Sequence, residues 1–340
     1  MKMAVMGGGQ RPAVVEAPDP VVADNYAKVK VHSAPLCTEF KGLDCETRVG
    51  FGHEAAGEVV EIGPNVRSVA VGDRVVVMPQ DSCGICDLCL SGEHIYCQSP
   101  RDPLAVCGSR TGRLTTAQYV IQQDRLLVRV PQEMPYDHAA MACCGFGPAF
   151  NAMQSMEISV GDTVLVGGLG PVGLGCVTVA LSRGATVLGL DMNPHRRGLA
   201  EQLGAARAFD PGDPDVLDQV LAATRGGQGV SASVQCVRVE DVGRFLVQAT
   251  RRRGQISFIG QGGTLDIARL VIKGLRLHGC WHWNHDLHGE RMIATIQAST
   301  ERINRMITHT FPIDRIADAF DLQLSGECGK VIIHPWEEES

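Results

Sequence analysis

The chain contains no uninterrupted apolar run of the roughly 18 residues that a membrane span requires. It also lacks an excess of positive charge, since its formal net charge is −7. The basic cluster Arg251-Arg252-Arg253 is too short for a nucleic-acid surface, and we expect it to form a solvated turn before a strand at 255–259. Neither a membrane nor a nucleic acid is therefore expected as a partner.

A secretory signal is also missing, because residues 1–9 have neither the charged start nor the long apolar stretch of one. The chain nevertheless has 13 cysteines. In the reducing cytoplasm, where we expect this protein to reside, cysteines are metal ligands or free thiols rather than disulfides. Their clustering decides between these roles.

Two kinds of pattern divide the 340 residues, a length that suits about two domains. Up to residue 150, short segments such as 26–31 and 74–77 suggest antiparallel strands of a β-rich domain. Residues 151–285 alternate strands and helices, which predicts an α/β domain with a doubly wound parallel sheet. Residues 286–340 are assigned back to the β-rich domain.

A glycine motif follows the short apolar run at 163–166. Gly168, Gly170 and Gly173 stand in G-x-G-x-x-G register, which allows a tight turn and a close approach of the backbone to a pyrophosphate. The next strand closes at Asp191, where a carboxylate accepts from both ribose hydroxyls and repels a 2′-phosphate. The motif predicts NAD rather than NADP. The turn consists of Gly168, Leu169, Gly170, Pro171, Val172 and Gly173.

Further cofactor contacts are expected at the carboxyl ends of later strands, where such sheets bind the nicotinamide half. The candidates there are Val237, Ile259, Gly260 and Trp281. Arg196 is placed to cover the adenosine, and a solvated charge at a helix start is the alternative. Four histidines show no tight ligand spacing, and we expect them to form an amphipathic rim or a subunit contact: His278, His282, His285 and His288.

Four cysteines in a polar loop have the spacing C-x2-C-x2-C-x7-C: Cys83, Cys86, Cys89 and Cys97. Four thiolates on so short a loop can close a tetrahedron around Zn²⁺ and leave no open position for a substrate. We therefore expect a structural zinc site. An iron–sulfur cluster uses the same ligand type and is the alternative.

A second set of possible ligands is scattered along the chain. It comprises Cys37, His53 of the Gly52-His53-Glu54 triplet, and the pair Cys143-Cys144. Mixed Cys and His ligands from distant segments are the pattern of catalytic zinc, whose open position admits the substrate oxygen. Each residue alone is more often a hydrogen-bonded or buried core residue.

The order of these motifs resembles that of the zinc-dependent medium-chain alcohol and polyol dehydrogenases over nearly the whole chain. The resemblance implies a GroES-like catalytic domain, a Rossmann domain, NAD, and two zinc ions per chain, one catalytic and one structural. It also implies that Cys37, His53 and a third residue hold the catalytic zinc. Cys144 is preferred as the third ligand because it directly precedes Gly145-Phe146-Gly147, and Cys143 is the alternative.

The resemblance further implies that Glu54 lies near the metal and that the protein is a homodimer or homotetramer. One departure concerns the proton relay, because the family reads Cys, any residue, Ser or Thr, then Asp, whereas this chain reads Cys37-Thr38-Glu39-Phe40. Aligned without a gap, Glu39 occupies the hydroxyl position. With one residue deleted, Thr38 supplies the hydroxyl and Glu39 the acid that orients His53. Both alignments remain open, and the deletion keeps both chemical roles.

The expected reaction is hydride transfer between NAD and a small-molecule alcohol or ketone polarised by zinc. Trp281, His282 and Glu39 suggest a cleft with polar groups, which favours a secondary alcohol of polyol, cyclitol or sugar type. A primary alcohol or aldehyde is the alternative substrate. A zinc-stabilised NAD-binding protein without turnover is the alternative from a different class.

Overall fold

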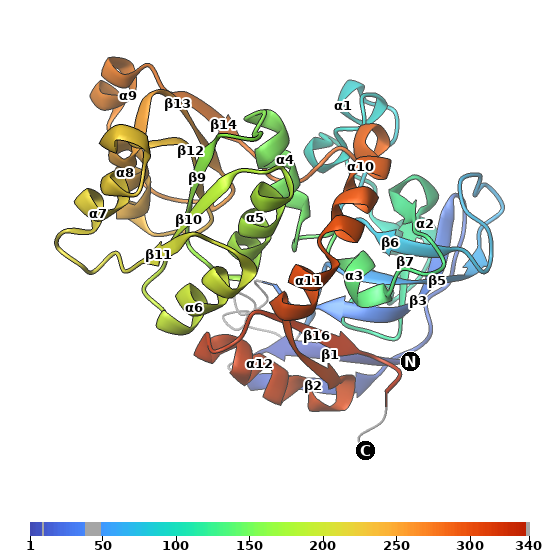
Figure 1. The fold of residues 1–340 in the computed structure, drawn as a ribbon. Coiled ribbons are helices and arrows are strands. Elements are labelled where there is room, and N and C mark those ends of the chain that lie inside the picture. The colour runs from blue at the N-terminus through green and yellow to red at the C-terminus, as the bar shows by residue number, and fades with distance from the viewer. Residues whose placement is uncertain (9, 38–48, 338–340) are drawn as a thin grey trace. The chain divides into compact units, whose positions relative to one another are not determined.

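The computed structural model describes residues 1–8, 10–37 and 49–337, so Thr38 and Glu39 lie outside the described residues (Figure 1). The chain divides into two compact units. The first contains Met1–Cys144, Asn284–Gln297 and Ile307–Ser340, and the second contains Gly145–Trp283 and Ala298–Met306. Within the described ranges, no helix has both the length and the apolar character needed to cross a membrane.

The first unit is built mainly from β-strands. Its strands are β1 (Lys2–Gly7), β2 (Gln10–Glu16), β3 (Tyr26–Pro35), β4 (Val49–Gly50), β5 (Ala55–Ile62), β6 (Arg74–Val77), β7 (Tyr119–Gln123), β8 (Leu127–Arg129), β15 (Ile307–Pro312) and β16 (Lys330–His334). One sheet has the order β2-β1-β4, and the larger sheet has the order β15-β16-β3-β5-β6-β8, with β7 also paired to β3. The return of β15 and β16 to this sheet brings the end of the chain beside its beginning.

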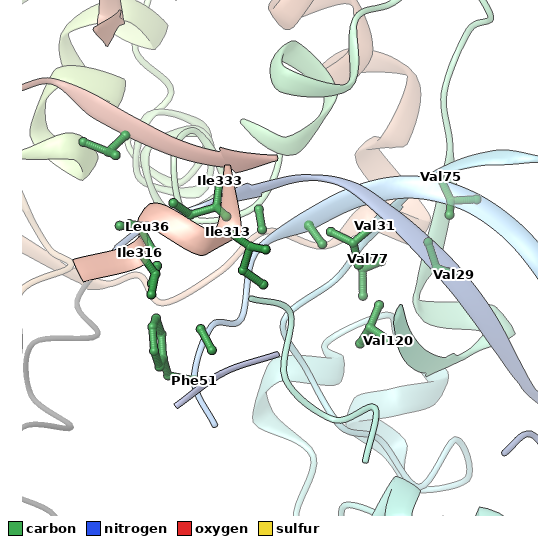
Figure 2. Packing of buried hydrophobic residues seen from close by; sticks show 14 of the residues in the cluster. Val29, Val31, Leu36, Phe51, Val75, Val77, Val120, Ile313, Ile316 and Ile333 are labelled. Atoms are coloured by element: carbon green, nitrogen blue, oxygen red, sulfur yellow. The ribbon is translucent and has the colours of Figure 1, made fainter. Parts of the chain in front are cut away.

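β3 is the centre of the larger sheet, since it pairs antiparallel with β5, β7 and β16. Its valines at 29 and 31 are buried, whereas the alternating Lys28 and Lys30 are partly exposed. This alternation of β-branched and polar residues is what a strand with one wetted face requires. Figure 2 shows Val29 and Val31 in one hydrophobic cluster with Val77, Val120 and Ile333.

Short helices complete the first unit. They are α1 (Asp87–Leu90), α2 (Pro103–Cys107), α3 (Tyr136–Ala140), α10 (His285–Ala298) and α12 (Ile316–Ser325), with the 3-10 turns η2 (His94–Tyr96), η3 (Asp124–Leu126) and η5 (Ile313–Arg315). α12 buries Ile316, Ala319 and Phe320 in the cluster of Figure 2 and ends at Gly326, which has a φ of 73°. A left-handed glycine is the common way to end a helix.

The second unit is a doubly wound parallel sheet with the strand order β11-β10-β9-β12-β13-β14. The strands are β9 (Thr163–Gly167), β10 (Thr186–Leu190), β11 (Arg207–Phe209), β12 (Val230–Gln235), β13 (Thr250–Phe258) and β14 (Arg276–Gly279). The helices are α4 (Gly147–Ser155), α5 (Pro171–Ser182), α6 (Pro194–Leu203), α7 (Val216–Ala222), α8 (Glu240–Ala249), α9 (Ile267–Lys273) and α11 (Thr300–Met306), with the 3-10 turn η4 (Arg225–Gly227). This arrangement confirms the predicted α/β sheet and its combination with a β-rich domain.

Two segments can be compared with the sequence-based expectation. Arg251, Arg252 and Arg253 lie within the bounds of β13, but the pairing of β13 with β12 passes from Thr250 directly to Gln255, and the three side chains are exposed, with a φ of 60° at Arg253. The expected solvated turn before the strand is thus present as an irregular stretch that precedes the paired residues from Gln255 onward. The domain boundaries expected from the sequence also divide the chain into two parts, but they place α11 in the first domain. In the structure α11 is part of the second unit. Arg302 Nε in this helix donates to Leu203 O at 3.0 Å.

Candidate metal centres and nucleotide site

Cys37 follows the central strand β3. Leu36 N donates to Val331 O at 2.9 Å, and Gln323 Nε2 donates to Cys37 O at 2.6 Å. The backbone on both sides of the thiol is thus held by β16 and α12. Cys37 itself is buried, so its sulfur has a fixed position inside the first unit.

His53 is positioned by the glycine before it. Gly52 has a φ of 96°, and a Cβ at this position would overlap with Thr116 Oγ1 and lie 2.6 Å from Thr116 N. Only glycine fits so close an approach in this backbone conformation. Thr116 N also donates to Phe51 O at 3.2 Å, which fixes the loop that presents His53.

Cys144 completes this group, because its Sγ lies 3.2 Å from His53 Nε2. The ligand atoms of Cys37, His53, Glu54 and Cys144 all lie within 4.8 Å of one another. Contact with Cys144, and then with His53, holds the pKa of the Cys37 thiol well below its usual range although burial opposes the shift. A thiolate, a second thiol and an imidazole are the donors that catalytic zinc uses in proteins.

Cys143 points elsewhere. Its Sγ lies 3.3 Å from Val77 O and 3.9 Å from Ala55 O, and the side chain is fully buried. Burial raises the pKa of this thiol far above its usual value, so it stays protonated. The structure therefore brings Cys144, and not Cys143, beside His53.

Glu54 forms a buried ion pair with Lys330, whose Nζ lies 2.6 Å from Glu54 Oε1. Burial raises the pKa of the Glu54 carboxyl, whereas the ammonium group of Lys330 opposes this shift. The other carboxyl oxygen, Oε2, is buried and has no hydrogen-bond partner among the described residues. Because an unsatisfied buried oxygen is costly, this atom beside two thiols and an imidazole fits a site that holds a cation.

The four-cysteine loop forms a second cluster, with the ligand atoms of all four residues within 4.8 Å of one another. Cys86 N donates to Cys83 Sγ at 3.4 Å, and Cys83 N donates to Cys97 Sγ at 3.2 Å. The backbone N–H groups of Ile85 and Cys86 lower the pKa of Cys83 to about 6. Four converging sulfurs with N–H donors aimed at them suit a tetrahedral zinc that has no open position.

The glycine turn of the second unit has three distinct parts. Gly168 has a φ of 95° and lies against Val237, and a Cβ at Gly173 would overlap with Gly168 O. A Cβ at Gly170, in contrast, would meet no atom of the described residues within 4 Å. Gly168 and Gly173 are therefore required by packing, whereas Gly170 leaves open space at the N-terminus of α5, where helices bind phosphates.

Asp191 follows β10 and is fixed by the backbone. Its Oδ2 accepts from Leu169 N at 2.7 Å, and its Oδ1 accepts from Asn193 N at 2.8 Å. A cavity of about 440 Å³ lies beside it. The cavity is lined by Gly168, Leu190, Asp191, Met192, Asn193, Arg196, Pro211, Val237, Val239, Asp241, Val242 and Phe245. Four of the cofactor residues expected from sequence thus share one cavity: Gly168, Asp191, Arg196 and Val237.

The remaining cofactor candidates lie outside the residues that line this cavity. Ile259 N donates to Gln235 O at 3.0 Å, and Gly260 lies so close to Val237 O that a Cβ would overlap with it. Trp281 is half-exposed. Sequence reasoning missed the apolar wall of the cavity, including Val239 and Phe245, although side chains that follow strand ends are the place to look for it.

Comparisons with known proteins agree with this geometry. The model of the alcohol dehydrogenase GroES-like domain matches residues 23–132, and that of the zinc-binding dehydrogenase matches residues 171–298. The uncharacterized zinc-type alcohol dehydrogenase-like protein YphC of Escherichia coli (strain K12) is 32% identical over 288 residues, which are 83% of this chain and 80% of that protein. The chain belongs to the zinc-dependent medium-chain dehydrogenase family. The resemblance inferred from the motifs is confirmed.

Other members of this family give the same result. L-threonine 3-dehydrogenase of Paraburkholderia xenovorans (strain LB400) is 31% identical over 286 residues, 83% of this chain and 81% of that protein. The alcohol dehydrogenase TADH from Thermus sp. ATN1 has a TM-score of 0.86 at 23% identity and covers 98% of this chain and 99% of its own. The 2R,3R-butanediol dehydrogenase from Bacillus subtilis has a TM-score of 0.80 at 23% identity, with 98% and 99% covered. The chain thus has the fold of this family of oxidoreductases, and membership supports zinc and NAD as cofactors in general.

Proposed function

We propose that the protein interconverts a secondary alcohol of polyol, cyclitol or sugar type and its ketone, with zinc and NAD. The observation that carries this proposal is the convergence of Cys37, His53 and Cys144, with the imidazole and the last thiol 3.2 Å apart. Glu54 Oε2, buried and without a hydrogen-bond partner in the described ranges, supports a cation at the same place.

In this proposal Cys37, His53 and Cys144 hold the catalytic zinc. When bound, zinc acts as a Lewis acid that polarises the substrate oxygen and lowers the pKa of an alcohol toward neutrality. Two thiolates balance the charge of the ion, and Lys330 balances Glu54. Thr38 or Glu39 carries the proton of the alcohol outward, and both alignments of that segment remain open. The loop with Cys83, Cys86, Cys89 and Cys97 holds a second, structural zinc.

The second unit supplies the cofactor site. The turn at 168–173 receives the pyrophosphate at the N-terminus of α5, and Asp191 binds the ribose of the adenosine. Each oxygen of Asp191 accepts one backbone N–H, and an ionised carboxylate has further lone pairs for two hydroxyls. Arg196 lines the same cavity and contacts the adenosine side, while Val237, Ile259, Gly260 and Trp281 are assigned to the nicotinamide half.

The names of two relatives support a secondary alcohol. L-threonine 3-dehydrogenase and 2R,3R-butanediol dehydrogenase are both named for a hydroxyl on a carbon that bears two other carbons. The cysteine as third ligand, Cys144, supports a primary alcohol instead, because the resemblance associates it with the simple alcohol branch. Direct assay with NAD⁺ against polyols, cyclitols, vicinal diols and primary alcohols separates these substrates. We expect reduction of NAD⁺ with secondary alcohols, and turnover of primary alcohols alone would overturn the substrate class.

A variant pair tests the metal site. Cys144→Ser removes the proposed ligand, so we expect one zinc fewer per chain and a loss of turnover, while NADH binding measured by fluorescence remains. Cys143→Ala is the matched control, because the sulfur of Cys143 faces Val77 O and Ala55 O. This variant should keep both zinc ions and most of its turnover. Unchanged zinc content and turnover in Cys144→Ser would contradict the proposed site. A wild-type chain that binds NADH and zinc but oxidises no alcohol would instead favour the non-catalytic alternative.

A further inference from the structure

We propose that the first unit contains a third metal site, formed by His94, His285 and Asp286 and suited to a divalent transition-metal ion such as Zn²⁺. His94 begins the 3-10 turn η2, between the third and fourth cysteines of the four-cysteine loop, and the other two residues begin α10. This site shares no residue with the proposed catalytic centre. Its presence is therefore independent of the proposed dehydrogenase activity.

The carboxylate of Asp286 joins the two imidazoles. Its Oδ2 lies 3.0 Å from His94 Nε2, and its Oδ1 lies 3.4 Å from His285 Nε2. The ligand atoms of the three residues all lie within 4.8 Å of one another. Ligands about 2.0–2.2 Å from a tetrahedral Zn²⁺ are roughly 3.3–3.6 Å apart. Only small side-chain shifts are thus needed to place an ion between these three residues.

The orientation of the two rings agrees with a shared ion. The ring centroids of His94 and His285 are 5.1 Å apart, with an angle of 25° between the ring planes. Two imidazoles that bind one tetrahedral ion through Nε2 have centroids about 5 Å apart, because each centroid is about 3 Å from the metal. Both Nε2 atoms also face the carboxylate of Asp286, which stacking of the two rings alone does not require.

A fourth donor is close by. His285 Nε2 donates to Arg125 O at 2.9 Å, and an ion bound at Nε2 would replace this hydrogen bond and have the carbonyl oxygen within reach. Two imidazoles, a carboxylate and a carbonyl oxygen form a nitrogen and oxygen donor set without sulfur. Such a set suits Zn²⁺, Co²⁺ or Ni²⁺. Because it contains no thiolate, a metal bound there would lack the thiolate charge-transfer band expected at both cysteine sites.

Burial and access also fit a metal site. The side chains of His94 and His285 are 2% and 4% exposed, whereas Asp286 is 47% exposed, so an ion can enter past the carboxylate.

The two segments that supply the ligands are held together. Asn284 Nδ2 donates to Ser91 O at 2.8 Å and to Glu93 Oε1 at 3.1 Å, and Leu287 N donates to Asn284 Oδ1 at 3.1 Å. Asn284 thus ties the start of α10 to the loop that carries His94. A site whose ligands are fixed in this way needs little rearrangement to bind its ion.

Titration of the zinc-loaded full chain with Co²⁺ tests the proposal by calorimetry and absorbance. We expect one further equivalent to bind with ligand-field bands and without a thiolate charge-transfer band. Asp286→Asn retains an oxygen that can accept from His94 but lacks the charged ligand, and His94→Gln removes one imidazole. Each should weaken binding of that equivalent by at least about tenfold. His309→Gln changes an exposed histidine of β15 and is the control that should bind like the wild type.

Three results would overturn the proposal. They are no uptake beyond the cysteine sites, uptake accompanied by a thiolate band, and uptake that is the same in Asp286→Asn, His94→Gln and the wild type. Thermal unfolding of each variant shows that it is folded before the titration. Alcohol turnover is measured separately, so a failure of the proposed function cannot be mistaken for a failure of this site.

Discussion

Lys330 Nζ lies 2.6 Å from Glu54 Oε1, and neither side chain is exposed to solvent. Lys330 is the first residue of β16, and Glu54 immediately precedes β5. Removal of one partner from such a pair leaves an uncompensated charge in the interior. We expect Lys330→Met to lower the free energy of unfolding by about 3–5 kcal/mol, measured by urea unfolding followed by circular dichroism.

The ion pair between Lys28 and Glu61 is the control for this experiment. It joins β3 to β5 in the same sheet, but the side chain of Glu61 is 50% exposed. Lys28→Met should therefore cost no more than about 1 kcal/mol. The double variant Glu54→Gln/Lys330→Met should recover part of the stability lost in Lys330→Met. Equal costs of Lys330→Met and Lys28→Met would contradict the role given to the buried pair.

Gly52 and Gly72 share a left-handed backbone, with φ values of 96° and 92°, but differ in their surroundings. A Cβ at Gly52 would overlap with Thr116, whereas one at Gly72 would meet no atom of the described residues within 4 Å. We expect Gly72→Ala to cost about 1 kcal/mol through backbone strain alone. Gly52→Ala should cost about 1–3 kcal/mol more.

The overlap of the new methyl group with Thr116 in Gly52→Ala should also displace His53 and so weaken zinc binding. Zinc content and thermal unfolding of the two variants measure both effects. If Gly52→Ala keeps its zinc and unfolds like Gly72→Ala, the close approach to Thr116 is not what positions His53.

The glycines of the nucleotide turn should separate stability from cofactor binding. Gly173→Ala forces its Cβ onto Gly168 O, so we expect a lower melting temperature together with weaker NADH binding. Gly170→Ala meets open space in the protein and should leave the melting temperature unchanged, yet its methyl group would occupy the approach of the pyrophosphate.

NADH fluorescence and thermal unfolding measure these two effects. Gly198→Ala is the control, since it lies in α6 with no atom of the described residues within 4 Å of the new methyl group. It should bind NADH normally and gain up to about 1 kcal/mol from helix propensity. Normal NADH binding by Gly170→Ala would remove Gly170 from the proposed phosphate site.

His334 should make stability depend on pH. The hydrogen bond to Asp137, at 2.9 Å, raises the pKa of His334 above its usual 6.5. A raised folded-state pKa means that this stabilisation is fully present below pH 6.5 and is lost as the pH rises through the folded-state value. We expect an effect of roughly 1 kcal/mol or less.

Urea unfolding at several pH values measures how much of the free energy of unfolding is lost as the pH rises. His334→Gln retains a donor for Asp137 without the charge change, so the loss between pH 6.5 and 8.5 should be smaller than in the wild type (roughly 1 kcal/mol or less of difference). Asp137→Asn should reduce it in the same way. A loss of the same size in both variants would assign the pH dependence to other groups.

Most of what could be predicted depends on local patterns in the sequence. Three such patterns are the glycine turn, the alternation of strands and helices, and the spacing of Cys83 to Cys97, and each can be recognised without knowing the fold. Pairings between distant segments cannot be recognised in this way. Lys330 and Glu54 are separated by 276 positions, and His94 and Asp286 by 192.

The choice between Cys143 and Cys144 also could not be made from the sequence, although the two residues are neighbours. The two thiols are adjacent in sequence, and only the direction of the chain after α3 decides which sulfur faces His53. The irregular spacing of the four histidines between 278 and 288 predicts an amphipathic rim or a subunit contact. His285 in fact meets His94, which lies in a loop far earlier in the chain.

Four residues of the candidate catalytic site lie at the ends of three neighbouring strands, and the fifth, Cys144, follows α3. β16 begins with Lys330, β3 is followed by Cys37, and β5 is preceded by His53 and Glu54, and these strands are consecutive in their sheet. These strands fix the positions of Cys37, His53 and Glu54 relative to one another, and they separate only in a rare opening of the core of the sheet. Loss to a chelator of an ion held by these side chains should therefore be slow, whereas zinc in the loop of Cys83 to Cys97 should be lost first.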